Sequence, residues 1–281
     1  MHIYNQLKDI NKGVFNGIVA GAFFQLKKDG IFKTREVLSK NHPSKILFLD
    51  VIADHSISEN KIILSANERL LFLKQLGVMH YYRVTADEFQ EAMQSFFTGF
   101  SEEKNNLYLL CGVSQTGIDH SISSQFIFSS FENSNSFVWH RQLGYLYPLT
   151  GKVVYGNKIG RTMGFPTANL RPEESDKIIP PMGVYAGWIK HGFSWYKTMI
   201  NIGIRPTLDL ENVTIEAHIF NFSQDIYGHD ISIHFQTRIR DEMRFPSLEV
   251  LKKQLQKDQK TALHMLEGNG PESEEDNFII F

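Results

Sequence analysis

The sequence predicts two domains of different class, an α/β domain followed by an all-β domain. In the first half, nearly continuous apolar runs such as residues 45–53 alternate with helix-like stretches, a pattern typical of buried parallel strands joined by helices. In the second half, short strand-like runs with period-two alternation follow one another closely between turn signals, which is typical of an antiparallel barrel. The pattern changes at residues 144–151, and 281 residues are enough for two domains.

The first half supplies the strands and helices of a β-α-β arrangement. Ser65 is positioned to cap a helix beginning at Ala66, and Glu68 completes a capping box. Gly77 ends this helix, and its expected apolar stripe is Leu70, Leu73 and Leu76. We also expect a helix over residues 87–97 and a second buried strand over residues 107–111.

The second half contains turn signals at residues 180–183, 190–192 and 227–230. Residues 231–235 alternate strictly, which places Ile231, Ile233 and Phe235 on the inner face of a strand. Ser247 is the expected N-cap of a closing helix whose stripe is Leu248, Leu251 and Leu255. Beyond residue 266 the chain is acidic and rich in helix-breaking residues, so residues 267–281 are expected to form a mobile tail.

Composition excludes several classes of protein. Lys and Arg together number 29 against 31 for Asp and Glu, a formal charge of −2, so no global field indicates a nucleic-acid or membrane partner. The single cysteine, Cys111, has no internal disulfide partner, and no apolar run reaches eighteen residues. We therefore expect a cytoplasmic protein. Nothing in the sequence specifies an oligomeric state.

The stretch Gly160-Arg-Thr-Met-Gly-Phe-Pro-Thr-Ala-Asn169 carries the strongest functional signal. Glycines allow backbone N–H groups to approach an anion, and Lys158 and Arg161 add positive charge. After Pro166 the chain is expected to be extended, which places Thr167 and Asn169 on one face. Hydroxyl and amide oxygens suit Mg²⁺ bound to nucleotide phosphates. An ordinary glycine-rich hairpin followed by a strand is the alternative that spacing alone leaves open.

Residues from about 145 to 263 resemble a riboflavin kinase domain. The matching blocks occur in order at residues 151–156, 160–169, 183–186, 201–207, 214–218, 225–228 and 240–245. The resemblance implies a Greek-key antiparallel barrel, within a domain of residues 145–266, that transfers the γ-phosphate of ATP to the 5′-hydroxyl of riboflavin. The substrates would be riboflavin and ATP, with Mg²⁺ as cofactor.

The same resemblance assigns roles to individual residues. Alternation along residues 214–219 sets Glu216 and His218 on the face opposite Ile215 and Ala217, and Glu216 is the expected general base. Thr167 and Asn169 are the expected metal ligands. The expected ATP-binding residues are Lys158, Gly160, Arg161, Gly164 and Pro166. His218, Arg240 and Arg244 are expected on the flavin side, although Arg161, Arg240 and Arg244 would serve equally well in ion pairs.

Residues 1–144 resemble, more weakly, the FMN adenylyltransferase domain of bacterial bifunctional enzymes, which implies a Rossmann-like nucleotidyltransferase-type sheet. That family's first motif, Gly-x-Phe-Asp-Gly-x-His-x-Gly-His, is matched to residues 13–22, where Val19 and Ala22 replace both histidines. In the second motif, matched to residues 122–128, Phe128 replaces the phosphate-binding arginine. We therefore expect no FAD synthesis.

Two other functions remain open at this stage. One is a flavin- or nucleotide-binding regulatory protein with a slow or vestigial kinase site. The other is a bifunctional enzyme that uses substitute residues for adenylyl transfer. The intact Thr167, Asn169 and Glu216 argue against the first, and the loss of two motifs together argues against the second.

Overall fold

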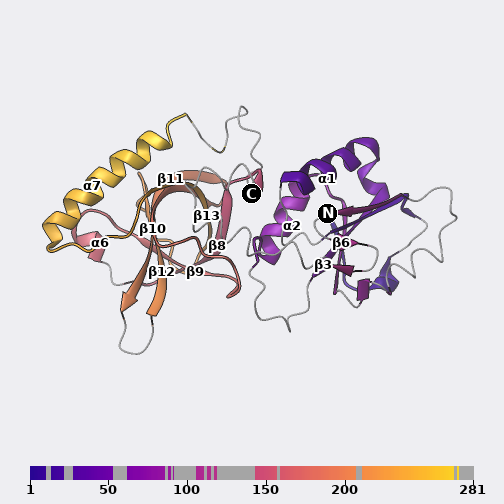
Figure 1. Ribbon diagram of the computed structural model, residues 1–281, viewed down its shortest axis with the longest axis horizontal. Coiled ribbons are helices and arrows are strands. Elements are labelled where there is room, and N and C mark those ends of the chain that lie inside the picture. The colour runs from indigo at the N-terminus through magenta and orange to yellow at the C-terminus, as the bar shows by residue number, and fades with distance from the viewer. Residues whose placement is uncertain are drawn as a thin grey trace. The chain divides into compact units, whose positions relative to one another are not determined.

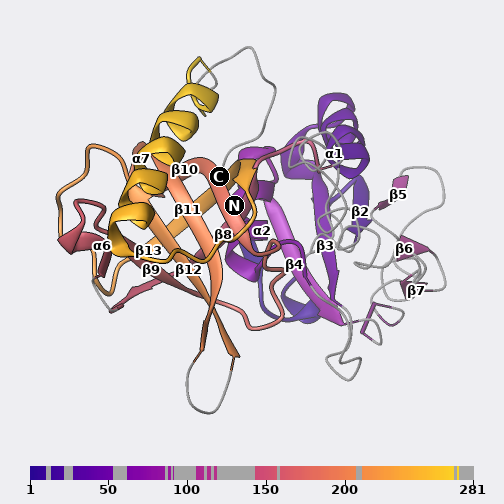
Figure 2. The same cartoon turned by 60° about the vertical axis from the view of Figure 1, so that its left-hand side comes forward.

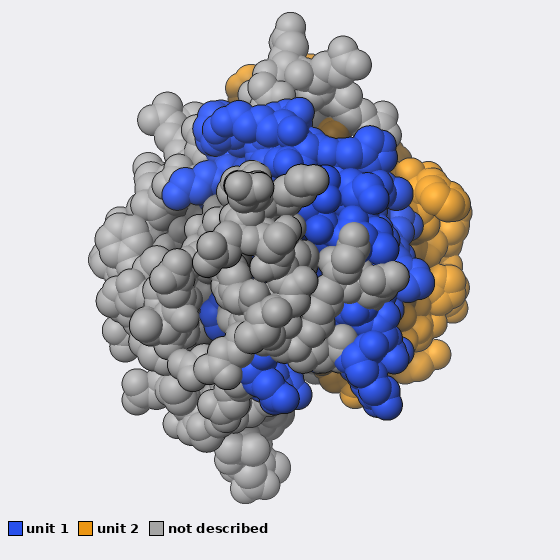
Figure 3. All heavy atoms as spheres, turned by 90° about the vertical axis from the view of Figure 1, so that its right-hand side faces the viewer, with its two compact units in different colours: residues 1–127, 281 blue, residues 128–280 orange. Residues whose placement is uncertain are grey.

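The computed structural model divides the chain into two compact units, residues 1–127 and residues 128–280 (Figure 3). The structure describes residues 1–10, 14–21, 28–52, 62–85, 88–89, 91, 106–110, 113–114, 117–118, 143–156, 159–206, 211–268 and 271. Among these residues no helix is long and apolar enough to cross a membrane.

The first unit is built on a parallel sheet (Figure 1), and its five strands have the order β1-β4-β3-β2-β5, in which β4, β3, β2 and β5 can be followed in Figure 2. Its strands are β1 (His2–Tyr4), β2 (Gly17–Gly21), β3 (Ile46–Ile52), β4 (His80–Thr85) and β5 (Asn106–Leu110). Its helices are α1 (Lys28–Lys40) and α2 (Ala66–Gln75), with 3-10 turns at Leu7–Asp9 and Pro43–Lys45. A small pair, β6 (Val113–Ser114) and β7 (Gly117–Ile118), is antiparallel. The predicted parallel α/β arrangement is confirmed.

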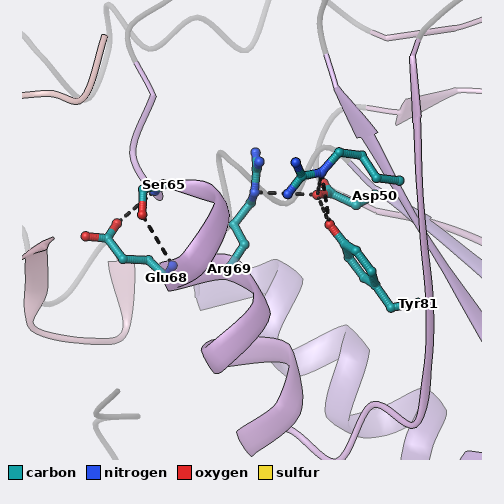
Figure 4. Close-up of polar contacts among 6 residues, drawn as sticks. Asp50, Ser65, Glu68, Arg69 and Tyr81 are labelled. Atoms are coloured by element: carbon teal, nitrogen blue, oxygen red, sulfur yellow. Dashed lines mark hydrogen bonds and ion pairs between the residues drawn. The ribbon is translucent and has the colours of Figure 1, made fainter. Parts of the chain in front are cut away.

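Local sequence explains the boundaries of α2. Ser65 accepts a hydrogen bond from the Glu68 backbone, while the Glu68 carboxylate accepts one from the Ser65 N–H, so the predicted capping box is present (Figure 4). Gly77 adopts a φ of 91° just beyond the helix, as expected for its C-terminal stop. The predicted stripe is only partly right. Leu73 is buried, but Leu70 and Leu76 are half-buried and the fully buried Phe72 lies beside Leu73.

The second unit is a closed six-stranded antiparallel barrel, as predicted, with strand order β10-β11-β12-β9-β8-β13. Its strands are β8 (Tyr147–Val154), β9 (Ala168–Pro172), β10 (Gly183–His191), β11 (Ser194–Pro206), β12 (Glu211–Ile219) and β13 (Asp230–Arg240). A single turn, α6 (Ile159–Thr162), precedes β9, and α7 (Leu248–Met265) follows the barrel.

Alternation along the strands separates two apolar layers. Ile231, Ile233 and Phe235 are buried as predicted, and the Phe235 ring lies 5.4 Å from that of Tyr185. The intervening His234 is also completely buried, which the alternation did not predict. On β10 the alternate residues Val184 and Ala186 belong to a second cluster that α7 shares.

Helix α7 packs along the outside of the barrel (Figure 2). Ser247 caps it as predicted and accepts a hydrogen bond from the Val250 N–H. The predicted position of Leu248 in the stripe is wrong, because this side chain is 60% exposed. The face toward the barrel begins one turn later and consists of Leu251, Leu255, Asp258, Ala262 and Leu266.

The acidic tail lies almost wholly outside the described residues, as do the 87–97 helix in most of its length and Cys111. The predicted boundary between residues 144 and 145 stays a prediction, since residues 119–142 also lie outside them.

Candidate active site

Strand pairing brings together a hydroxyl, an amide and a carboxylate. Strands β9 and β12 run antiparallel with Asn169 directly opposite Glu216, so both side chains leave the same face of the sheet. Thr167 immediately precedes β9, and its hydroxyl donates a 3.0 Å hydrogen bond to Oε2 of Glu216. On the other side of β12, Asn201 of β11 also lies opposite Glu216. The three residues predicted for base and metal therefore meet at one place in the barrel.

The side chain of Asn169 rests against the chain that follows the adjacent strand β8. A Cβ added to Gly156 would lie only 2.2 Å from Nδ2 of Asn169, so the amide rests against the bare backbone of residue 156. Asn169 is also largely buried. Gly156 is therefore needed for the position of the amide rather than for a positive φ.

The turn before Thr167 is folded tightly on itself. The carbonyl oxygen of Gly160 accepts hydrogen bonds from the N–H groups of Met163 and Phe165. A Cβ on Gly160 would meet the Phe165 carbonyl oxygen at 2.2 Å, and Gly164 has a φ of 86°. Both glycines thus shape the turn, while Lys158 lies outside the described residues.

Two cavities open beside this turn, and Thr167 lines both. The first, of about 400 Å³, also includes Arg161, Pro166 and the segment of residues 222–227. The second, of about 300 Å³, includes Gly160, Asn201, Glu216 and His218. Its remaining walls are largely apolar. They come from the turn before β9, from β10, β11 and α7, and from the end of β13 and the loop after it, and they include Met243, Phe245, Leu251 and Leu255. The arrangement suits two ligands whose reacting groups meet at Thr167 and Glu216.

His218 supports the turn from the side of the second cavity. Its Nδ1 lies 2.8 Å from the carbonyl oxygen of Pro166, which can only accept, so Nδ1 carries the proton. Burial lowers the pKa of His218 more than this hydrogen bond raises it. The ring also packs edge-on against Phe165 at 5.2 Å. His218 is therefore a neutral side chain that fixes the backbone before Thr167.

Arg240 lines the second cavity but is bound to α7. Its Nε and Nη2 donate to Oδ2 of Asp258 at 2.9 and 2.7 Å, and its Nη1 donates to the Asp241 carbonyl oxygen. Gln254 donates to the other oxygen of Asp258. Of the two roles that the sequence left open for Arg240, the structure thus shows the ion pair. Arg244 is exposed and is absent from the described linings of both cavities.

Sequence reasoning missed two polar residues of this region. Glu242 lines the second cavity, and a Cβ on Gly203 would meet its Oε1 at 2.3 Å. Asp258 anchors Arg240 from a helix position that periodicity assigns to an apolar residue. Glu242 lies inside the matched block of residues 240–245, so the family resemblance could have identified it. Asp258 is a single carboxylate in the apolar stripe of α7, and nothing in the sequence pattern identifies it.

The structure describes residues 17–21 of the first nucleotide motif as strand β2, where Val19 is buried opposite Phe48 of β3. The chain passes from β2 to α1 between residues 21 and 28, a stretch with the sequence Gly21-Ala-Phe-Phe-Gln-Leu-Lys-Lys28. This stretch contains no histidine either, so the absence of the two motif histidines does not depend on how the motif is aligned with the sequence. The second motif, residues 122–128, lies outside the described residues.

A buried ionic cluster that the sequence did not predict lies in β3 and its neighbours (Figure 4). Asp50 is fully buried, and its Oδ2 accepts a 2.5 Å hydrogen bond from the Tyr81 hydroxyl. Nε of Arg69 and of Arg83 lie 3.5 and 3.8 Å from the same oxygen. Burial, and then the charge of Asp50, raise the pKa of Tyr81. These partners offset the cost of placing a carboxylate inside the sheet.

Comparison with known proteins matches residues 143–266 to the family model described as riboflavin kinase. The bifunctional riboflavin kinase/FMN adenylyltransferase of Haemophilus influenzae is 39% identical over 142 residues, 50% of this chain and 46% of that protein. The Bacillus subtilis protein of the same description is 38% identical over 148 residues, 52% of this chain and 46% of its own length. The match therefore spans just under half the length of these curated relatives.

A crystal structure described as a macrolide-efflux protein from Streptococcus pneumoniae is similar over both units. It is 25% identical with a TM-score of 0.73, and the match covers 93% of this chain and 98% of that one. The family match, the alignment with the curated relatives and the closed barrel all concern the C-terminal half of this chain. The C-terminal half of this chain is a domain of the riboflavin kinase family.

Proposed function

We propose that this protein is a riboflavin kinase, which converts riboflavin and ATP to FMN and ADP with Mg²⁺. The observation that carries the proposal is the Thr167–Glu216 hydrogen bond at the point where the two cavities meet. Phosphoryl transfer requires alignment of a hydroxyl with the γ-phosphate and compensation of charge, and little covalent chemistry from the protein. A site with one cavity for each substrate, joined at Thr167 and with a carboxylate hydrogen-bonded to that residue, meets these requirements.

Glu216 acts as the general base in this proposal. As the riboflavin 5′-oxygen forms its bond to phosphorus, the hydroxyl proton passes to the Glu216 carboxylate. The bond between the γ-phosphorus and the bridging oxygen breaks, and ADP leaves with its electron pair. Oε2 accepts a hydrogen bond from the Thr167 hydroxyl, which keeps the carboxylate beside the residue that lines both cavities.

ATP occupies the first cavity, where Arg161 and Pro166 of the turn face its phosphates, whereas Gly160 lines the second cavity. Lys158 is assigned to the same role from the sequence. Thr167 lines the first cavity and donates a hydrogen bond to Glu216, and Asn169 lies directly opposite Glu216 on β9. Their hydroxyl, amide and carboxylate oxygens form a donor set that fits Mg²⁺. When bound there, Mg²⁺ would neutralise phosphate charge. Because Arg161 is exposed, its guanidinium loses little hydration when it binds a phosphate.

Riboflavin occupies the second cavity. A flat aromatic ring can pack against the apolar side chains of this cavity, which include Met243, Phe245, Leu251 and Leu255. Glu216 lies at the polar end of the cavity. His218 contributes by holding the Pro166 backbone. Arg240 contributes indirectly, because its bond to Asp258 fixes α7 as one wall of the cavity. A direct contact between Arg244 and the FMN phosphate stays a prediction.

We further propose that the protein makes no FAD and that its first domain is a nucleotidyltransferase-type fold that has lost its chemistry. The absence of histidine between β2 and α1 supports this. The proposed domains are residues 1–144 and 145–266, followed by a tail at residues 267–281. We also propose that the barrel has a Greek-key topology and that the protein is cytoplasmic.

One experiment separates the three functions. The full chain is incubated with riboflavin, ATP and Mg²⁺, and the flavins are resolved by chromatography over time. We expect FMN and ADP in equal amounts and no FAD. FMN followed by FAD at a comparable rate would support the bifunctional enzyme. Tight flavin or nucleotide binding without either product would reject the kinase and support the regulatory protein.

A further inference from the structure

Two histidines face each other at the edge of the barrel, away from Thr167 and Glu216. His191 ends β10, and His229 immediately precedes β13. Nε2 of His191 and Nδ1 of His229 lie 3.0 Å apart, with the rings tilted by 33°. His191 is half-buried and His229 is exposed, so solvent reaches the pair.

The spacing of these nitrogens matches a metal-binding pair. With metal–nitrogen bonds of about 2.0–2.1 Å, two imidazoles lie about 3.3 Å apart in a tetrahedral shell and about 2.9 Å apart at a right angle. The observed 3.0 Å falls between these values, so the separation of the two nitrogens suits a shared ion, toward which both rings would turn their lone pairs. For both facing nitrogens to become ligands, the proton between them moves to an outer ring nitrogen. This is a change of tautomer that releases no proton from a neutral pair.

One carboxylate and one ammonium group lie close to the pair. The carboxylate of Asp230, next to His229, lies at this edge and is bound at 2.8 Å by Lys152, which also donates to the Gly228 carbonyl oxygen. Among the described residues no third His, Cys, Asp or Glu joins the pair, so water would complete the shell. Two nitrogen ligands select a borderline transition ion such as Zn²⁺ over Mg²⁺, which prefers oxygen.

The pair also contacts both ends of the segment of residues 222–229, of which residues 222–227 line the first cavity. Phe222, at the start of this segment, packs edge-on against His191 at 5.9 Å, and His229 follows its end. The backbone there is anchored to β8, since Gly228 N–H donates to the Val153 carbonyl oxygen and Val153 N–H donates to that of His229. His191 thus touches both ends of the segment.

We propose that His191 and His229 form a site for one Zn²⁺-class ion, and that the bound ion ties together the two ends of segment 222–229. The first statement is independent of the kinase proposal. The second rests on that proposal, because it concerns ATP or ADP bound beside this segment. With half the ligands of a structural zinc site, we expect a dissociation constant of roughly 1–100 μM.

The test is a calorimetric titration of the full chain with Zn²⁺, in chelator-free buffer with constant Mg²⁺ and no nucleotide. We expect His191→Ala and His229→Ala each to remove one binding event or weaken it at least tenfold. His264→Ala is the matched control, because His264 is 87% exposed and lies far along the sequence on α7, and it should bind as the parent does. Parent-like stoichiometry and affinity in both His191→Ala and His229→Ala would overturn the site.

A second titration tests the tie to segment 222–229. We expect Zn²⁺ to change the apparent dissociation constant for ADP about threefold or more in the parent and not in His191→Ala. Equal ADP affinity with and without bound Zn²⁺ would overturn the coupling. Absence of ADP binding under any condition would instead count against the kinase proposal, so the two failures are distinguishable. Far-UV circular dichroism confirms that each variant is folded.

Discussion

The ion pair between Arg240 and Asp258 yields a prediction that separates a structural role from flavin binding. The side chain of Arg240 is 16% exposed and that of Asp258 only 2%, and two guanidinium nitrogens contact one carboxylate oxygen. Changing Asp258 to Leu leaves the guanidinium largely buried without its counter-charge. Loss of one partner of a buried pair costs about 3–5 kcal/mol, and the residual exposure of Arg240 reduces this to about 2–3 kcal/mol.

This cost translates into a measurable thermal shift. For a barrel domain of this size, 1 kcal/mol corresponds to roughly 3–5 °C, so Asp258→Leu should lower Tm by about 6–15 °C. Trp188 of β10 and Trp195 of β11 lie in the barrel, so their fluorescence reports on its unfolding. Asp230→Asn is the matched control, because the Lys152–Asp230 pair is 46% and 71% exposed and should cost less than about 1 kcal/mol.

The double variant Arg240→Met/Asp258→Leu completes the argument. An apolar pair of similar volume should restore most of the lost stability, to within about 1 kcal/mol of the parent. If Arg240 acts only through Asp258, the double variant binds FMN within a few-fold of the parent. Restored stability together with a loss of FMN affinity of tenfold or more would show that Arg240 contacts the flavin directly. An unchanged Tm in Asp258→Leu would refute the energetic reasoning.

Three further outcomes follow from the site and the core. Glu216→Gln keeps the shape of the base but cannot accept a proton, so turnover should fall about a hundredfold or more with little change in ATP binding, and parent-like turnover would reject Glu216 as the base. Gly156→Ala places a methyl group 2.2 Å from the Asn169 amide, so the Mg²⁺ concentration for half-maximal FMN formation should rise several-fold, and an unchanged Mg²⁺ titration would remove Asn169 from the metal site. Burial lowers the pKa of His234 to about 3, so below about pH 6.5 the unfolded chain binds the extra proton. The unfolding free energy should then fall by up to about 1.4 kcal/mol per pH unit as pH drops from about 6.5 toward 3, and denaturant titrations should show a flatter dependence in His234→Gln.

Periodicity predicted the elements whose environment is uniform along their length. The run at residues 45–53 became β3 because both faces of a central parallel strand are covered, and Ile231, Ile233 and Phe235 are buried because only one face of β13 meets the barrel interior. Periodicity failed where a polar side chain is buried with partners from distant segments. Asp50 depends on Tyr81, and Asp258 depends on Arg240. Such pairings are tertiary contacts, which a local pattern does not contain.

The candidate site was predictable to a different extent on its two sides. Thr167, Asn169 and Glu216 share a face through strand alternation and meet through the register of β9 and β12, which the matched blocks implied. Arg240 and Arg244 lie at or beyond the end of β13, where alternation no longer fixes the direction of a side chain.

The turn of residues 160–167 links the two cavities mechanically. Thr167 lines both, Arg161 and Pro166 line the first, and Gly160 lines the second. The backbone between them is fixed by the Gly160 carbonyl hydrogen bonds and by His218 at Pro166. A displacement of this turn must therefore move the nucleotide side and the flavin side together. In the proposed kinase, substitutions in the turn should change the KM of both substrates, whereas substitutions in α7 should affect riboflavin alone.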